Sequence, residues 1–233
     1  MKKIVTTLTA LALCAFVAST AFAAAANIRM SQVYPGGGSS TGFYTNDYVE
    51  LFNPTGAAVS IGGWSLQYGS ATGTSFGSSA GNAFVFPANA VIQPCKYVLI
   101  QLGTTGTGGT ALPVTPDYTT ANINMQANNG KIALIKNSTL INLCSGNTAG
   151  AIYADVVGYG TGNCYETTAA AATSASTGLV RGGGGMTDLD NNSTDLALAT
   201  NPVPHNSSSL ANVACLATPA TRSTWGQVKS IYR

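Results

Sequence analysis

Short stretches in which apolar and polar residues alternate recur along the chain, and turn-forming residues separate them. In Tyr48–Phe52, for example, Val49 and Leu51 fall on one face of an extended chain, and the remaining three residues fall on the other. This period of two predicts a β-strand with one face in a core. An Asn-Pro-Thr-Gly sequence follows at residues 53–56 and predicts a turn, because proline fixes φ and glycine permits positive φ.

The same reasoning predicts strands throughout the chain. They are Ile28–Tyr34, Tyr48–Phe52, Ala58–Ile61, Trp64–Tyr68, Ala83–Phe86, Tyr97–Gln101, Lys131–Ile135, Thr139–Asn142, Ile152–Tyr159 and Gly178–Arg181. A helical period of 3.6 residues appears only near the C-terminal end. Many short strands separated by turns are typical of an antiparallel β-sandwich, so we predict an all-β fold.

The N-terminal residues have the features of a secretory signal peptide. Two lysines precede an apolar run from Leu8 to Val17, and Ala21 and Ala23 fit the small-residue pattern of a cleavage site. Cys14 raises the alternative of a lipoprotein signal, but the leucine before it is bulkier than such signals allow. The run is also shorter than the roughly 20 residues of a membrane-spanning helix. We expect residues 1–23 to be removed and the mature protein to carry no transmembrane segment.

Removal of the signal peptide changes the charge balance. The whole chain has 10 Lys+Arg and 8 Asp+Glu, and two of the lysines leave with the signal, so 8 residues of each sign remain. Charged residues make up only 8% of the chain, against about 25% in ordinary globular proteins. A neutral surface rich in hydroxyl and amide groups lacks the basic patch that binds nucleic acid. We expect a protein or a cell-envelope polymer as partner, and no nucleic acid.

Four cysteines remain after the signal peptide, and an even count in an exported protein favours two disulfides over a metal site. Three pairings are open in principle. Cys144 and Cys164 flank the predicted strand Ile152–Tyr159 and could close a hairpin around it. That pairing would leave Cys95 for Cys215.

The stretch Tyr48–Tyr68 also resembles the signature of bacterial lamin-tail domains, E-[YF]-V-E-L-x-N followed by V-[SD]-L-x-G-W-x-L. Here it reads DYVELFN at residues 47–53 and VSIGGWSL at residues 59–66. Four further segments, in order from Ile28 to about Ser207, resemble other parts of this family. They are MSQVYPGGGSSTGFYTNDYVELFN, GKIALIKN, DVVGYG and RGGGGMTDLDNNSTDLALATNPVPHNS. The resemblance implies an immunoglobulin-like sandwich over residues 24–210, with Val49, Leu51, Trp64 and Leu66 in its core, and a C-terminal tail over residues 211–233. It implies no activity, because such domains occur alone and appended to secreted enzymes.

An acidic turn is the strongest candidate for a metal site. Asp188, Asp190, Asn192 and Asp195 place oxygen atoms at the alternating spacing of a calcium loop. The turn lacks the glycine at the sixth position and the glutamate at the twelfth, so we expect its side chains to bond nearby backbone amides, with calcium as the alternative. The preceding Arg181–Gly185 sequence, RGGGG, predicts a flexible loop, since no Lys-Ser/Thr pair follows to bind phosphate.

Catalytic machinery is hard to find in the sequence. His205, the single histidine, lies in a polar, turn-rich segment, and no G-x-S-x-G sequence supplies a nucleophile. Asp47 and Glu50 fall on different faces of one strand, so they cannot act on one substrate together. We expect Glu50 to accept hydrogen bonds from a neighbouring loop. We expect no catalytic residues, no cofactor and no enzymatic activity.

The C-terminal tail and the loops offer apolar groups for binding. Trp225, Val228, Ile231 and Tyr232 lie near helical spacing, although Gly226 weakens a helix. The tail would either pack on the sandwich or serve as a signal for export, anchoring or a partner. Aromatic residues predicted to lie in loops would form the binding surface; they are Phe43, Tyr44 and Tyr118.

These features together predict a secreted, non-enzymatic binding or structural module of the cell surface or extracellular matrix. Two alternatives are an accessory domain of an extracellular nuclease or hydrolase system and a calcium-dependent domain that binds a polymer. We expect the protein outside the cell or on its surface, with the periplasm as the alternative location.

Overall fold

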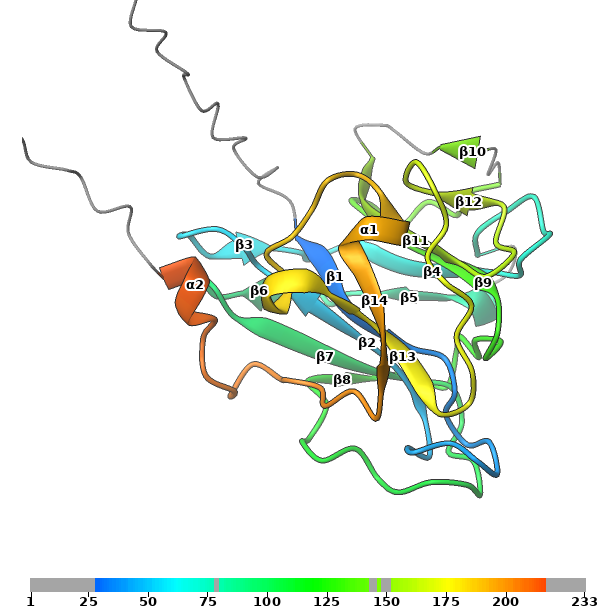
Figure 1. Cartoon of the computed structure of the whole chain (residues 1–233). Coiled ribbons are helices and arrows are strands. Elements are labelled where there is room, and N and C mark those ends of the chain that lie inside the picture. The colour runs from blue at the N-terminus through cyan, green and yellow to red at the C-terminus, as the bar shows by residue number, and fades with distance from the viewer. Residues whose placement is uncertain (1–27, 78–79, 143–145, 148–151, 217–233) are drawn as a thin grey trace, which may run out of the picture.

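The computed structural model describes residues 28–77, 80–142, 146–147 and 152–216 (Figure 1). The predicted signal peptide therefore lies outside the described residues, as do Cys144 and residues 217–233 of the predicted tail. No helix in these described ranges is long and apolar enough to cross a membrane.

Two β-sheets account for most of the described chain. The larger sheet has the strand order β14-β13-β1-β2-β7-β8, and the smaller has the order β11-β9-β4-β5. Strands of the larger sheet are β1 (Arg29–Tyr34), β2 (Asp47–Phe52), β7 (Tyr97–Leu102), β8 (Tyr118–Thr119), β13 (Thr177–Arg181) and β14 (Leu196–Thr200). Strands of the smaller sheet are β4 (Ser65–Gly69), β5 (Ala83–Val85), β9 (Gly130–Ile135) and β11 (Tyr153–Tyr159). Except for the parallel β7–β8 pair, neighbouring strands in both sheets are antiparallel, which confirms the predicted all-β, immunoglobulin-like sandwich.

Smaller elements connect the sheets. Two minor pairs join β3 (Val59–Ser60) to β6 (Val91–Ile92) and β10 (Gly146–Asn147) to β12 (Cys164–Tyr165). The short helices are η1 (Ala80–Asn82), η2 (Gly182–Gly184), α1 (Asn192–Asp195) and α2 (Val213–Leu216).

The predicted strand Thr139–Asn142 is wrong, because this segment forms hydrogen bonds with a side chain and with a loop and does not pair with a neighbouring strand. The Ile141 amide donates to Oε1 of Gln67, and the Ile141 carbonyl accepts from the Phe76 amide.

The main core lies between the two sheets. Val49 and Leu51 of β2 are fully buried there, together with Leu66 of β4, as the resemblance implied. Trp64 is only partly buried and packs against this core from its rim. Alternate residues of the inner strands fill the space between the sheets, as expected when two β-sheets pack face to face.

Parts of the outer faces of both sheets are covered as well, which the alternation in β2 did not predict. All six β2 residues are buried. On its outer face Tyr48 packs against Tyr34 and Tyr44, with ring centroids 5.5 and 5.9 Å apart. Phe52 packs against Tyr97 at 4.9 Å. On the smaller sheet, a second apolar cluster forms around Phe76, Ala133 and Ile135. The alternation did not predict this cluster, because loop residues supply part of it.

The loop aromatics are not the exposed binding surface that we expected. Tyr44 is buried, and its hydroxyl donates to the Pro202 carbonyl at 3.0 Å. Phe43 packs against the same tyrosine cluster. Tyr118 packs against Phe84 and Phe86, with ring centroids 5.9 and 5.6 Å apart. These rings pack against the sheets, because large aromatic side chains gain more from burial than from exposure.

A disulfide joins Cys95, just before β7, to Cys215 in α2, which is the pairing expected for these two residues. Cys164 is also disulfide-bonded. Its expected partner, Cys144, lies outside the described residues.

Candidate functional site

A buried arginine organises the acidic turn. Arg181, at the end of β13, has no exposed side-chain surface, and its Nε donates to the Met30 carbonyl at 2.9 Å. Its Nη2 donates to both carboxylate oxygens of Asp155, at 3.1 and 3.0 Å. Its Nη1 lies 3.3 Å from Asp188 and 3.5 Å from Asp195. A buried cation needs such partners, because an unpaired charge in the interior is costly.

Asp195 and Asn192 of the acidic turn also bond to backbone groups. Oδ2 of Asp195 accepts from the amides of Leu189 and Asn191, at 2.9 and 3.2 Å. The Asn192 amide group bonds to β11, donating to the Val156 carbonyl at 2.8 Å and accepting from the Gly158 amide at 2.9 Å. This arrangement fits the expected structural turn, in which side chains bond backbone amides.

The four calcium candidates do not converge on one point. Asp190 is exposed and has φ of 54°, whereas Asn192 faces β11. A different set comes together: carboxylate oxygens of Glu166, Asp188 and Asp195 lie within 4.8 Å of one another. Glu166 was missed in the sequence, because it precedes the turn by more than twenty residues and belongs to no ligand pattern. Arg29 also reaches this cluster, 3.4 Å from Asp188.

We expect calcium to have no effect on stability, because the oxygens of Asp188 and Asp195 are already bonded to arginines and amides. The melting temperature should be equal in calcium and in chelator, since only a ligand that binds the native state raises it. Thermal unfolding of the wild type and of Asp190→Ala would test this. A calcium-dependent rise in melting temperature that is lost in Asp190→Ala would support the calcium alternative instead.

An open groove on another part of the surface has a volume of about 640 Å³. It is lined by Tyr97 of β7, by His205, by Gly183 and Gly184, and by residues 209–213. The RGGGG sequence forms η2 here, and Gly183 and Gly184 adopt positive φ of 64°. Asn212 links these segments, because its side-chain amide donates to the Tyr97 hydroxyl at 3.2 Å and to the Gly183 carbonyl at 2.9 Å. The disulfide at Cys215 holds α2 beside the groove.

His205 links the groove to the sheet. Its ring stacks on Tyr97 with centroids 4.6 Å apart, and its Nδ1 lies 3.1 Å from Oε2 of Glu50. The His205 backbone amide donates to the same oxygen at 2.5 Å. Glu50 also accepts from the Ser31 hydroxyl at 2.6 Å and from the Gln32 side chain at 3.2 Å. Glu50 therefore accepts hydrogen bonds from a neighbouring loop, as predicted, and this buried carboxylate is hydrogen-bonded on both oxygens.

The raised pKa values of three ionisable groups predict that the free energy of unfolding falls as pH rises. Burial raises the pKa of Asp47 to about 7, and burial together with Asp155 raises the pKa of Glu166 to about 9. The hydrogen bond to Glu50 raises the pKa of His205. Each pKa in the folded protein lies above its unfolded value, so the bound proton stabilises the fold, and this contribution disappears as pH rises through the folded pKa.

The free energy of unfolding should therefore decrease between about pH 4 and pH 9, the window set by the unfolded carboxyl pKa values and by Glu166. Urea unfolding at a series of pH values would measure it. Asp47→Asn should remove the part of the decrease that falls between about pH 4 and pH 7, the unfolded and folded pKa values of Asp47. Stability that rises over this range would show that these groups are ionised in the native protein without cost.

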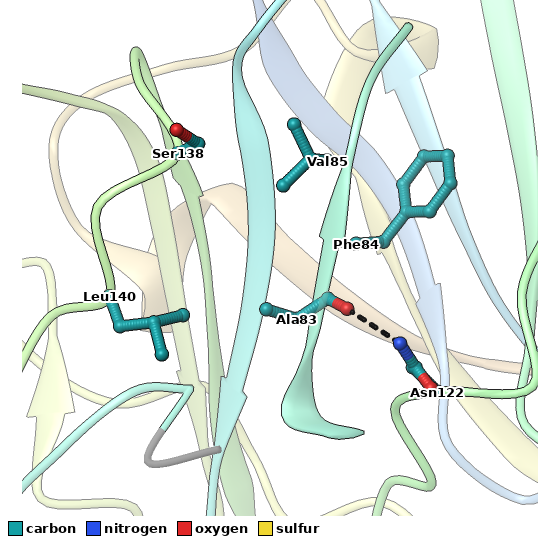
Figure 2. Close-up of a pocket in the computed structure, with 6 residues that line it drawn as sticks. All are labelled: Ala83, Phe84, Val85, Asn122, Ser138 and Leu140. Atoms are coloured by element: carbon teal, nitrogen blue, oxygen red, sulfur yellow. Dashed lines mark hydrogen bonds between the residues drawn. The ribbon is translucent and has the colours of Figure 1, made fainter. Parts of the chain in front are cut away.

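A second hollow, of about 380 Å³, lies at the edge of the smaller sheet. Figure 2 shows Ser138 and Leu140 across β4 from Ala83 and Val85 of β5, while Phe84 points the other way. Asn122 donates to the Ala83 carbonyl at 3.2 Å and so covers part of the edge of β5. Apart from Asn122 and Ser138, the lining is apolar, and it includes no charged side chain.

The fold and the motifs agree with known proteins. The family model described as Lamin Tail Domain matches residues 21–161. The crystal structure of a DUF4876 family protein from Bacteroides thetaiotaomicron is similar with a TM-score of 0.50 and 12% identity, over 76% of this chain and 72% of that chain. No curated protein matches the chain. Strands β13 and β14 and most of the groove lie after the matched residues, yet they complete the same sandwich. From the match over residues 21–161 and from the sandwich itself, we conclude that the chain belongs to the Lamin Tail Domain family.

Proposed function

We propose that the protein is an exported, non-enzymatic module that binds a protein or polymer at the cell surface or in the extracellular matrix. The predicted signal peptide and the Cys95–Cys215 disulfide support export, because disulfides persist in oxidising compartments. The family match is consistent with such a module, since a fold by itself does not imply an activity.

One observation carries the non-enzymatic part of the proposal: the buried carboxylates of Asp47, Glu50 and Asp155 hold the fold together. Asp155 pairs with Arg181, Glu50 binds the His205 segment, and the two Asp47 oxygens accept from the Gly37 and Met125 amides at 2.8 and 2.7 Å. A general acid or base must instead reach a substrate.

The Glu50–His205 pair is the nearest approach to catalytic machinery, because a carboxylate that orients an imidazole is two thirds of a hydrolase triad. A nucleophile is the missing third part. Ser209 lines the same groove, but its hydroxyl bonds to Oδ1 of Asn206 at 3.1 Å. Within the described residues, no hydrogen bond joins His205 to a serine, threonine or cysteine side chain.

An activity screen would test this proposal directly. Purified mature protein, residues 24–233, and its His205→Asn and Ser209→Ala variants should leave ester, peptide, nucleic acid and glycan substrates unchanged, with and without divalent metal. Equal background rates in all three proteins are the expected result. Turnover in the wild type that disappears in both variants would establish a hydrolase and contradict the proposal.

A further inference from the structure

Three exposed apolar side chains lie on and beside α2, at the rim of the groove. Leu210 is 89% exposed, Val213 is 80% exposed and Leu216 is 56% exposed. Leu210 and Val213 line the groove itself. Soluble proteins rarely gather exposed apolar side chains without a contact to bury them, so this rim has the character of a binding surface.

The lining of the groove favours an apolar or aromatic occupant. Its polar groups already have partners, since Asn212 donates to the Gly183 and Gly184 carbonyls and Tyr97 donates to the Gly184 carbonyl at 3.0 Å. The stacked rings of Tyr97 and His205 belong to this lining. Aromatic rings of this kind bind another ring by stacking or edge contact.

The chain itself supplies an occupant of this chemistry. The described chain ends at α2, beside the start of β7 (Figure 1), and 17 residues follow Leu216 (233 − 216). They include Trp225, Val228, Ile231 and Tyr232. Trp225 is nine residues from Leu216 (225 − 216), a reach of up to about 30 Å. Because the disulfide holds the start of this segment next to the groove, its effective concentration there is high, on the order of millimolar.

We propose that residues 217–233 bind in this groove, with Trp225 against Val213 and the Tyr97–His205 pair. The residues that line the groove include no carboxylate to attract Arg222 or Lys229. The Lys96 ammonium lies close by, where it donates to the Ser209 carbonyl. The contact is therefore apolar and depends little on salt. The segment occupies the groove in the resting protein, whether or not the module has an external ligand.

Tryptophan fluorescence tests the proposal, because the chain has two tryptophans and Trp64 belongs to the sandwich. The emission of Trp225 is the difference between the wild type and Trp225→Phe, a substitution that leaves the sandwich unchanged. We expect emission at shorter wavelength, and acrylamide quenching several-fold weaker, than in a free peptide of residues 217–233. Trypsin should cleave after Lys229 about tenfold more slowly in the wild type than in Val213→Asp. A factor of about ten is expected when one buried valine contact is lost.

Val85→Asp is the matched control, because it makes the same chemical change in the other hollow, where Val85 is 48% exposed (Figure 2). It should leave Trp225 emission unchanged, whereas Val213→Asp should shift the emission to that of the free peptide. Wild-type emission equal to that of the free peptide would overturn the proposal. So would a wavelength shift that grows with protein concentration, since the groove would then bind the segment of a second copy.

Discussion

Replacing Arg181 by methionine should lower the free energy of unfolding by about 3–5 kcal/mol, the range found when one partner of a buried ion pair is removed. The Arg181 side chain is fully buried and lies against three carboxylates, those of Asp155, Asp188 and Asp195. Methionine fills similar space but leaves Asp155, which is also buried, without its bidentate partner. Urea unfolding monitored by circular dichroism would measure the change.

Two controls separate this effect from the general cost of losing a cation. Lys136→Met removes a partly exposed cation that makes no ion pair within the described residues, so its effect should stay within about 0.5 kcal/mol. Adding Asp155→Asn to Arg181→Met should restore part of the lost stability, because the unpaired buried charge is then removed. A loss below about 1 kcal/mol for Arg181→Met would mean that water reaches these carboxylates in the native protein.

Removing the Cys95–Cys215 disulfide should cost about 2–5 kcal/mol, the usual range for a native bridge in an exported domain. The bridge closes a loop with a sequence separation of 120 residues, and long loops gain the most from closure in the chain-entropy model. The double variant Cys95→Ser with Cys215→Ser avoids an unpaired thiol. Its unfolding in urea should be compared with that of the wild type under non-reducing conditions.

The same variant should also loosen the groove. The Asn212 amide donates to the Cys95 carbonyl at 2.9 Å, so the bridge and this bond hold the α2 segment together. Tyr97 loses part of its environment when α2 moves, and tyrosine absorbance in the native protein should change. A double variant with wild-type stability would mean that the sandwich alone holds α2 in place.

Local patterns predicted the sandwich because they act over a few residues. The alternation in β2 and the Asn-Pro-Thr-Gly turn after it are both local patterns. The hydrogen bonds of Glu50 could be predicted for a similar reason, because a carboxylate in a buried strand needs hydrogen-bond donors whichever segment supplies them. The alternation could not show that Tyr48 and Phe52 are buried too, because the rings that cover them come from Tyr44 and Tyr97 on other segments.

The candidate sites were harder to predict, since they depend on residues far apart in the chain. Arg181 meets Asp155 across 26 residues and Met30 across 151, and no spacing pattern announces such contacts. The calcium spacing of Asp188, Asp190 and Asp195 describes only their order along the chain. In the structure Asp190 is exposed and Asp195 lies in α1, so the three side chains do not converge. Strand β14, whose sequence is LALAT, was missed because small alanines replace the polar residues of an alternating strand.

Binding of the mature protein to the surface of the cells that produce it tests the central claim most directly. Labelled protein, residues 24–233, would be added to washed cells at increasing concentration, and the bound fraction measured in about 0.05 and 0.5 M salt. The neutral surface predicts saturable binding with nearly equal affinity at both salt concentrations. Binding that does not saturate, or that is lost at high salt, would contradict an exported module that recognises a surface partner through uncharged contacts.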